Sequence, residues 1–384
     1  MKILVTGGAG FIGSHIVDVY IQGGHEVWVV DDLSGGKREQ VNPHARFVRM
    51  DLCSPDLKDV FAEGRFDCVN HHAAQVDARA SIMNPGRDAA LNIGGTLNLL
   101  EAMRAASVPC AIFASTGGAI YGGQGQFPSS EQHPTIPLSP YGVAKRAIEQ
   151  YLEYYHRVHA LKYIALRYAK VYGPRQDPER GFGVVAIFCG RILSGQQLII
   201  YGNGQQTRDY VYVQDVARAN LLALKYLTRS LESVESTQPV ASVESQHGMH
   251  TVSRPNNPNG LNKLNGPKRL NGVFNIGTGI ETSVNALTAM LLESADIDCP
   301  VVYQSARPGE QTRSVIDPSL AKLVLGWEPL ISLAEGLDQT LAWFRTNHKE
   351  PAHSKQQAAS TESDNWQHAV SCNLAAASEM SRLT

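Results

Sequence analysis

A tyrosine and a lysine that stand four positions apart, Tyr141 and Lys145, are the residues of this sequence best suited to proton transfer. They open an expected helix over residues 140–160, on which side chains four apart project from the same face. A phenol with its ordinary pKa of about 10 is a poor base at neutral pH, but a neighbouring cation favours its ionised form. The pair therefore predicts a proton acceptor and donor, although the same spacing also occurs in unreactive pairs on helix surfaces.

Two hydroxyl side chains supply the context that favours catalysis over an unreactive pair. Ser115 and Thr116 follow the apolar run at residues 110–114, which is predicted to be a buried strand. Ligands of open parallel sheets bind at the carboxyl ends of the strands. A hydroxyl at that edge can hydrogen-bond the same substrate oxygen that Tyr141 deprotonates.

A glycine-rich turn directly after the first predicted strand indicates a dinucleotide site. Gly7 makes the tight turn, Gly10 lets the backbone approach a pyrophosphate, and Gly13 lets helix and strand pack closely. The expected helix begins at Phe11 and Ile12, where its N–H groups face the anion. A glycine pattern alone also fits an ordinary tight turn, but the flanking strand and helix favour the cofactor site.

Acidic residues after the next two strands refine the choice of cofactor. Asp31, with Asp32 beside it, ends the second strand 18 residues past Gly13. A carboxylate there accepts hydrogen bonds from an adenosine ribose and repels the additional phosphate of NADP, so NAD is the predicted cofactor. Asp51 and Leu52, after the third strand, are placed to meet the adenine, while an exposed loop aspartate is the alternative interpretation of Asp51.

The elements that must position these residues alternate along the first half of the chain. Strands are expected at residues 2–6, 26–30, 46–49, 67–71, 110–114 and 163–167, and helices at 11–22, 56–62, 86–106 and 140–160. Such alternation predicts an α/β fold with a Rossmann-like doubly wound parallel sheet. Later helices are expected near residues 183–194, 214–228, 283–293 and 333–346, with a strand at 273–276.

Two domains are therefore expected. An NAD-binding Rossmann domain covers residues 1–170, with later segments returning to it, and a smaller α/β substrate-binding domain covers residues 171–346. Residues 229–271 and 347–384 are polar and poor in aromatic residues, and so they predict a disordered insertion and a disordered tail.

Composition excludes several classes of protein. The 384 residues carry a formal net charge of −2, which gives no basic field to attract nucleic acid or an anionic membrane. No apolar run approaches the roughly 20 residues of a membrane span, and the N-terminus enters a strand at once, so a cytoplasmic location is expected. The six cysteines show neither CxxC spacing nor paired histidines, which favours buried free thiols over a metal site or disulfides.

Taken together, these motifs resemble those of the extended short-chain dehydrogenases/reductases, most of all the UDP-glucose 4-epimerase branch of nucleotide-sugar epimerases. The similarity runs from Met1 to about Arg345, interrupted by the insertion. It implies that Thr116, with Ser115 beside it, acts together with Tyr141 and Lys145 on a sugar. It also implies that the cofactor is lined by further residues, namely Ala73, Ala74, Gln75, Asn92, Tyr141, Lys145 and Tyr168.

The resemblance further implies a UDP-sugar site on residues of the second half, namely Lys170, Val184, Tyr201, Arg208, Tyr210, Arg307 and Glu310. Arg208 and Arg307 would hold the diphosphate, since guanidinium groups match phosphate oxygens. Lys170 departs from the asparagine that is common in the family. Ser314 stands where some epimerases have tyrosine, which suggests room for an N-acetyl group.

The activity implied by the resemblance is 4-epimerisation through a 4-keto sugar with NAD regenerated in each turnover. Related dehydratases and decarboxylases need an acid after the catalytic threonine, where this chain has Gly117 and Gly118. A UDP-glucuronate 4-epimerase stays open as an alternative, and an NAD-sensing regulator is the alternative without catalysis. Relatives often form homodimers through the helices at 86–106 and 140–160, so a homodimer is expected.

Overall fold

The computed structural model describes residues 1–123, 126–180, 183–235, 272–307 and 311–347, and Met1–Thr346 form one compact unit. The boundary expected at residue 170 therefore stays a prediction. Of the two predicted disordered segments, residues 236–271 and 348–384 lie outside the described residues, and so does the predicted site residue Glu310.

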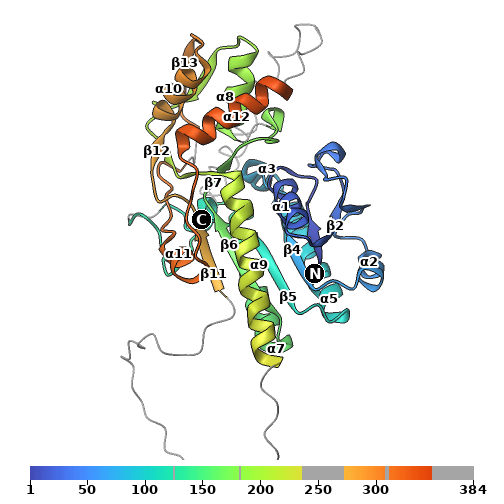
Figure 1. Cartoon of the computed structure of the whole chain (residues 1–384). Helices are drawn as coiled ribbons and strands as arrows, with labels where there is room; N and C mark the ends of the chain where they lie inside the picture. Colours follow the sequence, from blue (N-terminus) through green and yellow to red (C-terminus); the bar gives the residue numbers. More distant parts are fainter. Residues whose placement is uncertain (124–125, 181–182, 236–271, 308–310, 348–384) are drawn as a thin grey trace, which may run out of the picture. The chain divides into compact units, whose positions relative to one another are not determined.

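A seven-stranded parallel sheet forms the centre of the molecule (Figure 1). Its strands run in the order β11 (Gly272–Ile276), β6 (Lys162–Tyr168), β5 (Cys110–Thr116), β4 (Cys68–His71), β1 (Lys2–Thr6), β2 (Glu26–Asp31) and β3 (Arg46–Arg49). The central strands are buried along nearly their whole length because helices cover both faces. The predicted Rossmann-like doubly wound sheet is confirmed, and β11, from the second half of the chain, forms one edge of it.

Two hydrophobic clusters fix the helices to the two faces of this sheet. On one face, α1 (Phe11–Gln22), α9 (Val213–Glu235) and α11 (Ser319–Leu325) contribute buried side chains such as Ile16, Leu224 and Leu325. On the other face lie α2 (Leu57–Gly64), α5 (Gly95–Ala105) and α7 (Pro140–His159), with Leu57, Leu99 and Ile148. The helix α7 that carries Tyr141 and Lys145 is thus anchored by its apolar face against the strands.

Two expected helices differ in their bounds. The helix predicted over residues 86–106 is divided into α4 (Pro85–Ala89), a π-helical turn η2 (Ala90–Gly94) and α5. The helix expected to end near residue 228 continues to Glu235, so the first seven residues of the predicted insertion are helical. π-turns inside helices are frequent at functional sites, and this one contains the predicted cofactor residue Asn92.

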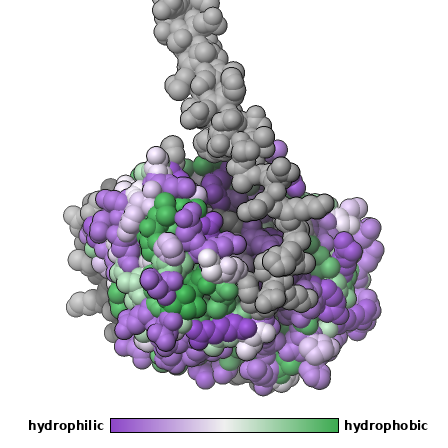
Figure 2. Space-filling view, turned by 90° about the horizontal axis from the view of Figure 1, so that it is seen from above, coloured by the Kyte–Doolittle hydropathy of each residue, from purple (hydrophilic) through white to green (hydrophobic). Residues whose placement is uncertain are grey.

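A third hydrophobic cluster builds the part of the molecule drawn at the top of Figure 1. It joins α8 (Val184–Leu193), α10 (Val284–Ala295) and α12 (Leu333–Asn347) to short strand pairs. These pairs are β7 (Lys170–Tyr172) with β10 (Tyr210–Tyr212) and β8 (Leu198–Tyr201) with β13 (Val301–Gln304). A further short pair is β9 (Thr207–Arg208) with β12 (Thr282–Ser283). Figure 2 looks down on this end, where an apolar patch lies among hydrophilic residues.

Four short helices complete the described fold: η1 (Arg38–Gln40), α3 (Ala78–Met83), α6 (Gly117–Ile120) and η3 (Pro178–Arg180). None of the helices in the described part of the chain is long and apolar enough to cross a membrane. Within the same residues, no group of three or more His, Cys, Asp or Glu side chains is arranged to hold a metal ion.

Candidate active site

The glycine turn has the geometry that a bound dinucleotide requires. Gly7 has φ +70°, and a Cβ there would lie 2.5 Å from the backbone nitrogen of Ala73. A Cβ on Gly13 would lie 2.2 Å from the carbonyl oxygen of Gly7, so this close approach of helix and turn requires glycine. Gly10 is the N-cap of α1, and no side chain caps the helix. The end of α1 that Phe11 and Ile12 begin is therefore open to an anion.

The acid at the end of β2 holds the glycine turn. Asp31 is buried, and its carboxylate accepts hydrogen bonds from the backbone N–H groups of Ala9 (3.0 Å) and Leu33 (2.8 Å). Asp32 is exposed and accepts from Ser34, which places it beside the same edge. Burial raises the pKa of Asp31 above its ordinary value, while the two N–H donors oppose that shift. A carboxylate fixed at this edge fits the ribose of an NAD cofactor.

Asp51 and Leu52 lie one strand further along the same edge. Asp51 is exposed and accepts a hydrogen bond from the backbone N–H of Cys53 at 2.8 Å, so its carboxylate shapes the loop after β3. Leu52 is buried, and its carbonyl oxygen accepts from the side chain of Asn98 at 2.6 Å. A role of these residues toward adenine stays a prediction.

Asn92 clamps the segment that follows β4. Its side chain accepts from the backbone N–H of Gln75 (2.9 Å) and donates to the carbonyl oxygen of Gln75 (3.0 Å). It also donates to Asp88 at 3.0 Å, and Asp88 accepts a second bond from the Gln75 side chain. In the same segment, Ala73 lies close to the glycine turn and donates its N–H to Thr6 Oγ1 at 3.3 Å.

Tyr168, at the end of β6, lies in a buried polar network behind the glycine turn. Its hydroxyl is 3.0 Å from His72 Nε2 and accepts from the Asn220 side chain at 2.8 Å. The rings of His72 and Tyr168 are stacked with their centres 5.9 Å apart. Burial lowers the pKa of His72 to about 3, so this histidine is neutral and holds Tyr168 by a hydrogen bond.

Tyr141 and Lys145 face the sheet together from the first two turns of α7. The backbone N–H of Tyr141 donates to Ser81 Oγ (3.2 Å), and Lys145 Nζ donates to the carbonyl oxygen of Ala114 (2.8 Å). Lys145 Nζ lies 5.8 Å from the centre of the Tyr141 ring and 4.7 Å from that of Phe113. The ammonium is thus anchored to β5, beneath the strand end that carries Thr116.

The charge states of this pair differ from the sequence-based expectation. Burial, with a smaller contribution from the charge of Asp88, raises the pKa of Tyr141. Burial lowers the pKa of Lys145 to about 8, and the carboxylates of Asp88 and Glu149 limit that fall. Lys145 is therefore charged at neutral pH, while the pKa of the phenol is set mainly by burial. A positively charged nicotinamide bound beside Tyr141 would favour the phenolate.

Successive residues of a strand point to opposite faces, and the structure separates Ser115 from Thr116 in this way. Ser115 Oγ donates to Glu149 Oε1 at 2.6 Å on the α7 side of the sheet. Thr116 caps the short helix α6, accepting from the backbone N–H of Ala119 at 3.2 Å. Thr116 therefore stays the predicted substrate-binding hydroxyl, while the hydroxyl of Ser115 is hydrogen-bonded to Glu149.

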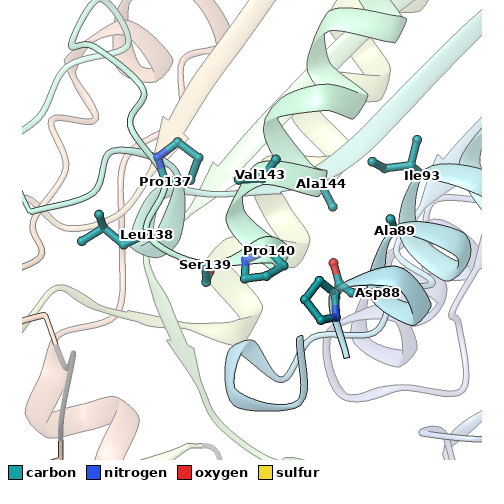
Figure 3. A pocket seen from close by; sticks show the side chains of 10 residues that line it. Asp88, Ala89, Ile93, Pro137, Leu138, Ser139, Pro140, Val143 and Ala144 are labelled. Carbon is teal, nitrogen blue, oxygen red and sulfur yellow. The ribbon is translucent and has the colours of Figure 1, made fainter. Parts of the chain in front are cut away.

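A pocket of about 530 Å³ lies between α4 and the start of α7 (Figure 3). Its lining is mostly apolar, with Ile93 on one wall and Leu138 and Val143 on the other. The side chain of Asp88 also lines it, and Asp88 Oδ2 is buried with no hydrogen-bond partner. The charge of Asp88, on α4, raises the pKa values of both Tyr141 and Lys145.

Three of the predicted substrate residues lie along neighbouring segments. The backbone N–H of Lys170 donates to Asp209 O at 2.8 Å, and that of Asp209 donates to Ser314 O at 2.9 Å. Lys170 at the start of β7, Arg208 in β9 and the buried Ser314 therefore lie on adjacent stretches of backbone. The carboxylate of Asp209 accepts from Thr278 (2.7 and 2.8 Å) and Gly279 (3.1 Å), which fixes this arrangement.

Tyr201 and Arg307 form a second group. Tyr201 ends β8, and the Arg307 guanidinium lies 3.7 Å from the centre of its ring, a cation–π contact. Val184 begins α8, and Tyr210 is buried in the third hydrophobic cluster, where its ring meets that of Tyr172. Tyr210 thus supports the fold at this position.

Three buried charged residues near the site were missed by the sequence analysis: Asp88, Glu149 and Arg167. The spacing of Tyr141, Lys145 and Glu149, four and eight residues apart on one helix face, is the signal that could have identified Glu149.

This fold and site define a Rossmann-type enzyme that works with a dinucleotide. Residues 3–233 match the NAD dependent epimerase/dehydratase family, and the chain belongs to that family. It is 36% identical to a UDP-glucose 4-epimerase of Mycolicibacterium smegmatis over 350 residues, which cover 90% of this chain and 99% of the relative.

Solved structures give the same relationship. A UDP-glucose 4-epimerase of Thermotoga maritima, crystallised with UDP-glucose, is 43% identical with a TM-score of 0.78, covering 91% of this chain and all of that one. A UDP-glucose 4-epimerase of Thermus thermophilus in complex with NAD is 38% identical with a TM-score of 0.76, covering 90% of this chain and 100% of that one. The predicted family and the predicted NAD dependence are confirmed.

We expect Asp31→Asn to weaken discrimination against NADP. The substitution removes the charge that repels a 2′-phosphate but keeps an oxygen that can accept from Ala9 or Leu33. The ratio of the dissociation constants for NADP and NAD should fall at least about tenfold, which corresponds to roughly 1.4 kcal/mol. Fluorescence titration of cofactor-free protein measures both constants. An unchanged ratio in Asp31→Asn, together with a fall in Asp32→Asn, would assign the discrimination to Asp32.

Proposed function

We propose that this protein is a UDP-sugar 4-epimerase that interconverts UDP-glucose and UDP-galactose. The observation that carries the proposal is the pair of Tyr141 and Lys145 on one face of α7, with Lys145 bonded to β5, the strand that ends at Thr116, in a sheet whose glycine turn fits NAD. The similarity to UDP-glucose 4-epimerases over 90% of the chain supports the same activity.

Each side chain has a defined task in this proposal. Tyr141 takes the proton of the sugar 4-hydroxyl and later gives it back, and Thr116 holds the same oxygen by a hydrogen bond. Lys145, anchored to the Ala114 carbonyl oxygen, keeps a positive charge near the phenol. NAD, when bound, would supply the oxidising power needed at C4 of the sugar. The glycine turn, Asp31 and the Gln75–Asn92 clamp hold the dinucleotide in register.

The diphosphate and the base are assigned to the second half of the chain. Arg208 and Arg307 carry the charge that a diphosphate needs, and Tyr201 offers a ring for the uracil. Arg307 lies over Tyr201, so a nucleotide that stacks on this ring must share the site with the guanidinium. Lys170 adds a positive charge near Arg208, since its backbone N–H bonds the carbonyl oxygen of the next residue, Asp209. Glu310 stays a predicted part of the UDP-sugar site.

A panel of UDP-sugars tests this function. Protein purified without added cofactor is incubated with UDP-glucose, UDP-galactose, the UDP-N-acetylhexosamines and UDP-glucuronate, and products are separated by chromatography. Interconversion of UDP-glucose and UDP-galactose is the expected result. Because Ser314 is small and buried, turnover of the N-acetyl pair is also expected. Turnover of UDP-glucuronate alone would replace the proposal by the UDP-glucuronate 4-epimerase, and NAD binding without turnover would favour an NAD-sensing regulator.

A homodimer is proposed from the outer face of α7. Val143, Tyr151, Tyr154 and Val158 lie on one side of this helix and are 39–57% exposed. The pocket lined by Leu138 and Ile93 continues that apolar surface. Light scattering after size exclusion should give twice the mass of the chain. Tyr154→Asp combined with Val158→Asp should halve this mass, and a wild-type chain that elutes as a monomer would contradict the dimer.

The cytoplasmic location is also proposed. The five cysteines in the described part of the chain, Cys53, Cys68, Cys110, Cys189 and Cys299, are free thiols. Free thiols are typical of a reducing compartment, which supports this location. Fractionation of the source cells with an antibody against the protein would test it, with the soluble cytosolic fraction as the expected place.

A further inference from the structure

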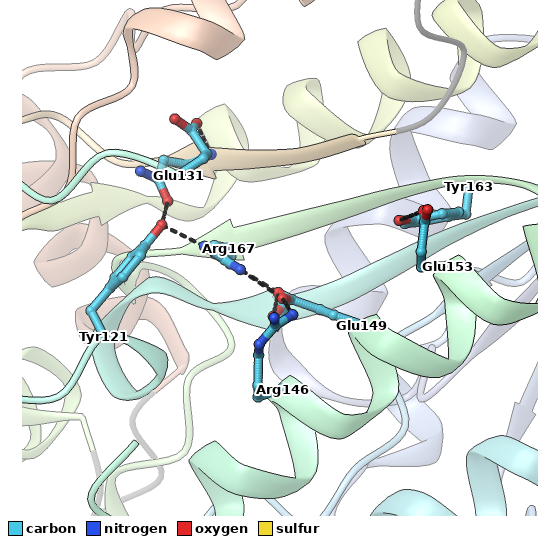
Figure 4. Close-up of polar contacts among 9 residues, drawn as sticks. Tyr121, Glu131, Arg146, Glu149, Glu153, Tyr163 and Arg167 are labelled. Atoms are coloured by element: carbon cyan, nitrogen blue, oxygen red, sulfur yellow. Dashed lines mark hydrogen bonds and ion pairs between the residues drawn. The ribbon is translucent and has the colours of Figure 1, made fainter. Parts of the chain in front are cut away.

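A buried carboxylate lies one helical turn beyond Lys145 on the same face of α7. Glu149 is 2% exposed and forms a two-pronged ion pair with Arg167 of β6, Nε to Oε1 at 2.9 Å and Nη2 to Oε2 at 2.7 Å (Figure 4). Its Oε1 also accepts from Ser115 Oγ of β5 at 2.6 Å. Glu149 therefore bonds one helix to two adjacent strands at the same point.

This junction lies immediately before the proposed reacting groups. Ser115 and Arg167 are partners in the register of β5 with β6, and the next pair along is Thr116 with Tyr168. On the helix, Glu149 follows Lys145 by four residues and Tyr141 by eight. Glu149 and Arg167 thus fix the relative positions of α7, β5 and β6. These elements carry Tyr141 and Lys145, Thr116, and Tyr168, respectively.

The network extends beyond the pair on the side away from α7. Arg167 Nη1 donates to Tyr121 Oη (2.8 Å), which donates to Asn275 Oδ1 of β11 (2.7 Å). The Asn275 side chain donates in turn to the carbonyl oxygens of Ser129 and Asp317. The guanidinium of Arg167 is held on both sides, so the ion pair has one fixed orientation.

Stability alone does not account for such a group. Burying two charges costs several kcal/mol of solvation each, and replacing a buried ion pair by apolar residues is often neutral or stabilising. A buried pair that joins three elements next to a reactive site is better explained by the geometry that it imposes.

We propose that Glu149, held by Arg167 and Ser115, is a positioning residue that sets Lys145 and Tyr141 against Thr116 and places a negative charge beside Lys145. The proposal rests on the function proposed above. It assigns Ser115, expected from the sequence to act on the substrate, to the support of Glu149.

The charged and titratable groups around Lys145 come from three other elements as well as from α7. Asp88 faces it from α4, Glu149 and Tyr141 from α7, and the neutral His71 and His72 from β4 and the segment after it. Arg167 of β6 lies behind Glu149. Burial lowers the pKa of Lys145 to about 8, and Asp88 and Glu149 oppose that shift. Removal of the Glu149 charge therefore lowers the pKa of Lys145 further.

The test is the pH profile of the Glu149→Gln holoenzyme. We expect the alkaline limb of kcat for UDP-galactose to move to lower pH by about one unit, because Lys145 loses its proton earlier. At pH 7, kcat should fall by about 10- to 100-fold through misplacement of Tyr141, with KM changed far less. Bound NAD, measured after denaturation of the protein, should stay at the wild-type level.

Glu153→Gln is the matched control. Glu153 lies one turn further along α7 and also bonds β6, accepting from Tyr163 Oη at 3.0 Å, but it is partly exposed and does not act on Lys145 (Figure 4). This variant should keep the wild-type profile. A Glu153→Gln profile shifted as far as that of Glu149→Gln would overturn the proposal, because any loss of a helix-to-strand bond would then have the same effect.

A double variant covers the case in which Glu149→Gln does not fold. Glu149→Gln with Arg167→Met leaves no unpaired buried charge, so it should fold, and it still lacks the carboxylate beside Lys145. It should show the same shift of the alkaline limb, and an unshifted limb would overturn the proposal. Wild-type protein that holds NAD but turns over no UDP-sugar would instead refute the proposed function.

Discussion

Tyr141→Phe is expected to lower kcat for UDP-galactose by about 10³-fold, because the phenol is the group placed to move the proton of the sugar hydroxyl. The phenylalanine ring fills the same partly buried space, and Lys145 keeps its bond to the Ala114 carbonyl oxygen. The variant should therefore hold NAD as the wild type does. Steady-state kinetics and the NAD content of the denatured protein measure both effects.

Tyr151→Phe is the control for this variant, since it removes a tyrosine hydroxyl from the exposed side of the same helix. It should keep the wild-type kcat. The role assigned to Tyr141 is wrong if Tyr141→Phe retains more than about a tenth of the wild-type kcat, a loss smaller than general acid–base catalysis provides.

Gly13→Ala should abolish stable NAD binding. The added Cβ would lie 2.2 Å from the carbonyl oxygen of Gly7 and 3.0 Å from the Cα of Gly8, so the glycine turn must move away from α1. Overpacking of this kind costs about 1–3 kcal/mol of stability, and it also displaces the backbone that faces the pyrophosphate. Purified protein should contain less than about a tenth of the wild-type NAD, a loss of more than 1.4 kcal/mol of binding free energy.

Gly94→Ala is the matched control for the steric argument. Gly94 is also helical, but a Cβ there meets nothing within 4 Å. Since alanine favours helix over glycine by about 1 kcal/mol, this variant should be as stable as the wild type or more so. Full NAD content in Gly13→Ala would show that the turn tolerates a side chain and that its glycine is not needed for the cofactor.

The first strand, first helix and second strand could be predicted from the sequence closely, because their signals are local. The apolar run at residues 2–6, the glycines and Asp31 follow one another within about 30 residues, and each is dictated by its own backbone conformation or burial. The pair of Tyr141 and Lys145 was found in the same way, from a spacing within one helix.

The rest of the site depends on contacts between residues far apart in the chain. Glu149 meets Ser115 and Arg167 across 34 and 18 positions, and no periodicity in the sequence encodes that pairing. The separation of Ser115 from Thr116 could in principle be predicted, since neighbouring residues of a strand face opposite sides. The raised pKa of Tyr141 was not, because it is set by burial that only the packed structure defines.

The π-turn at Ala90–Gly94 shows a third kind of limit. The apolar pattern predicts one helix over residues 86–106, and the side chain of Asn92 does not interrupt it. Asn92 instead bonds the backbone of Gln75 in both directions from within the widened turn. A tertiary clamp thus accompanies a local geometry that helix periodicity cannot predict.

The most direct test of the account is the fate of hydrogen at C4. Protein as purified, without added cofactor, is given UDP-glucose that carries deuterium at C4, and the UDP-galactose formed is analysed by mass spectrometry. The account predicts that the deuterium stays at C4, because the hydrogen removed from one face of the sugar is the one returned to the other. Product that has exchanged this deuterium for solvent hydrogen would contradict it.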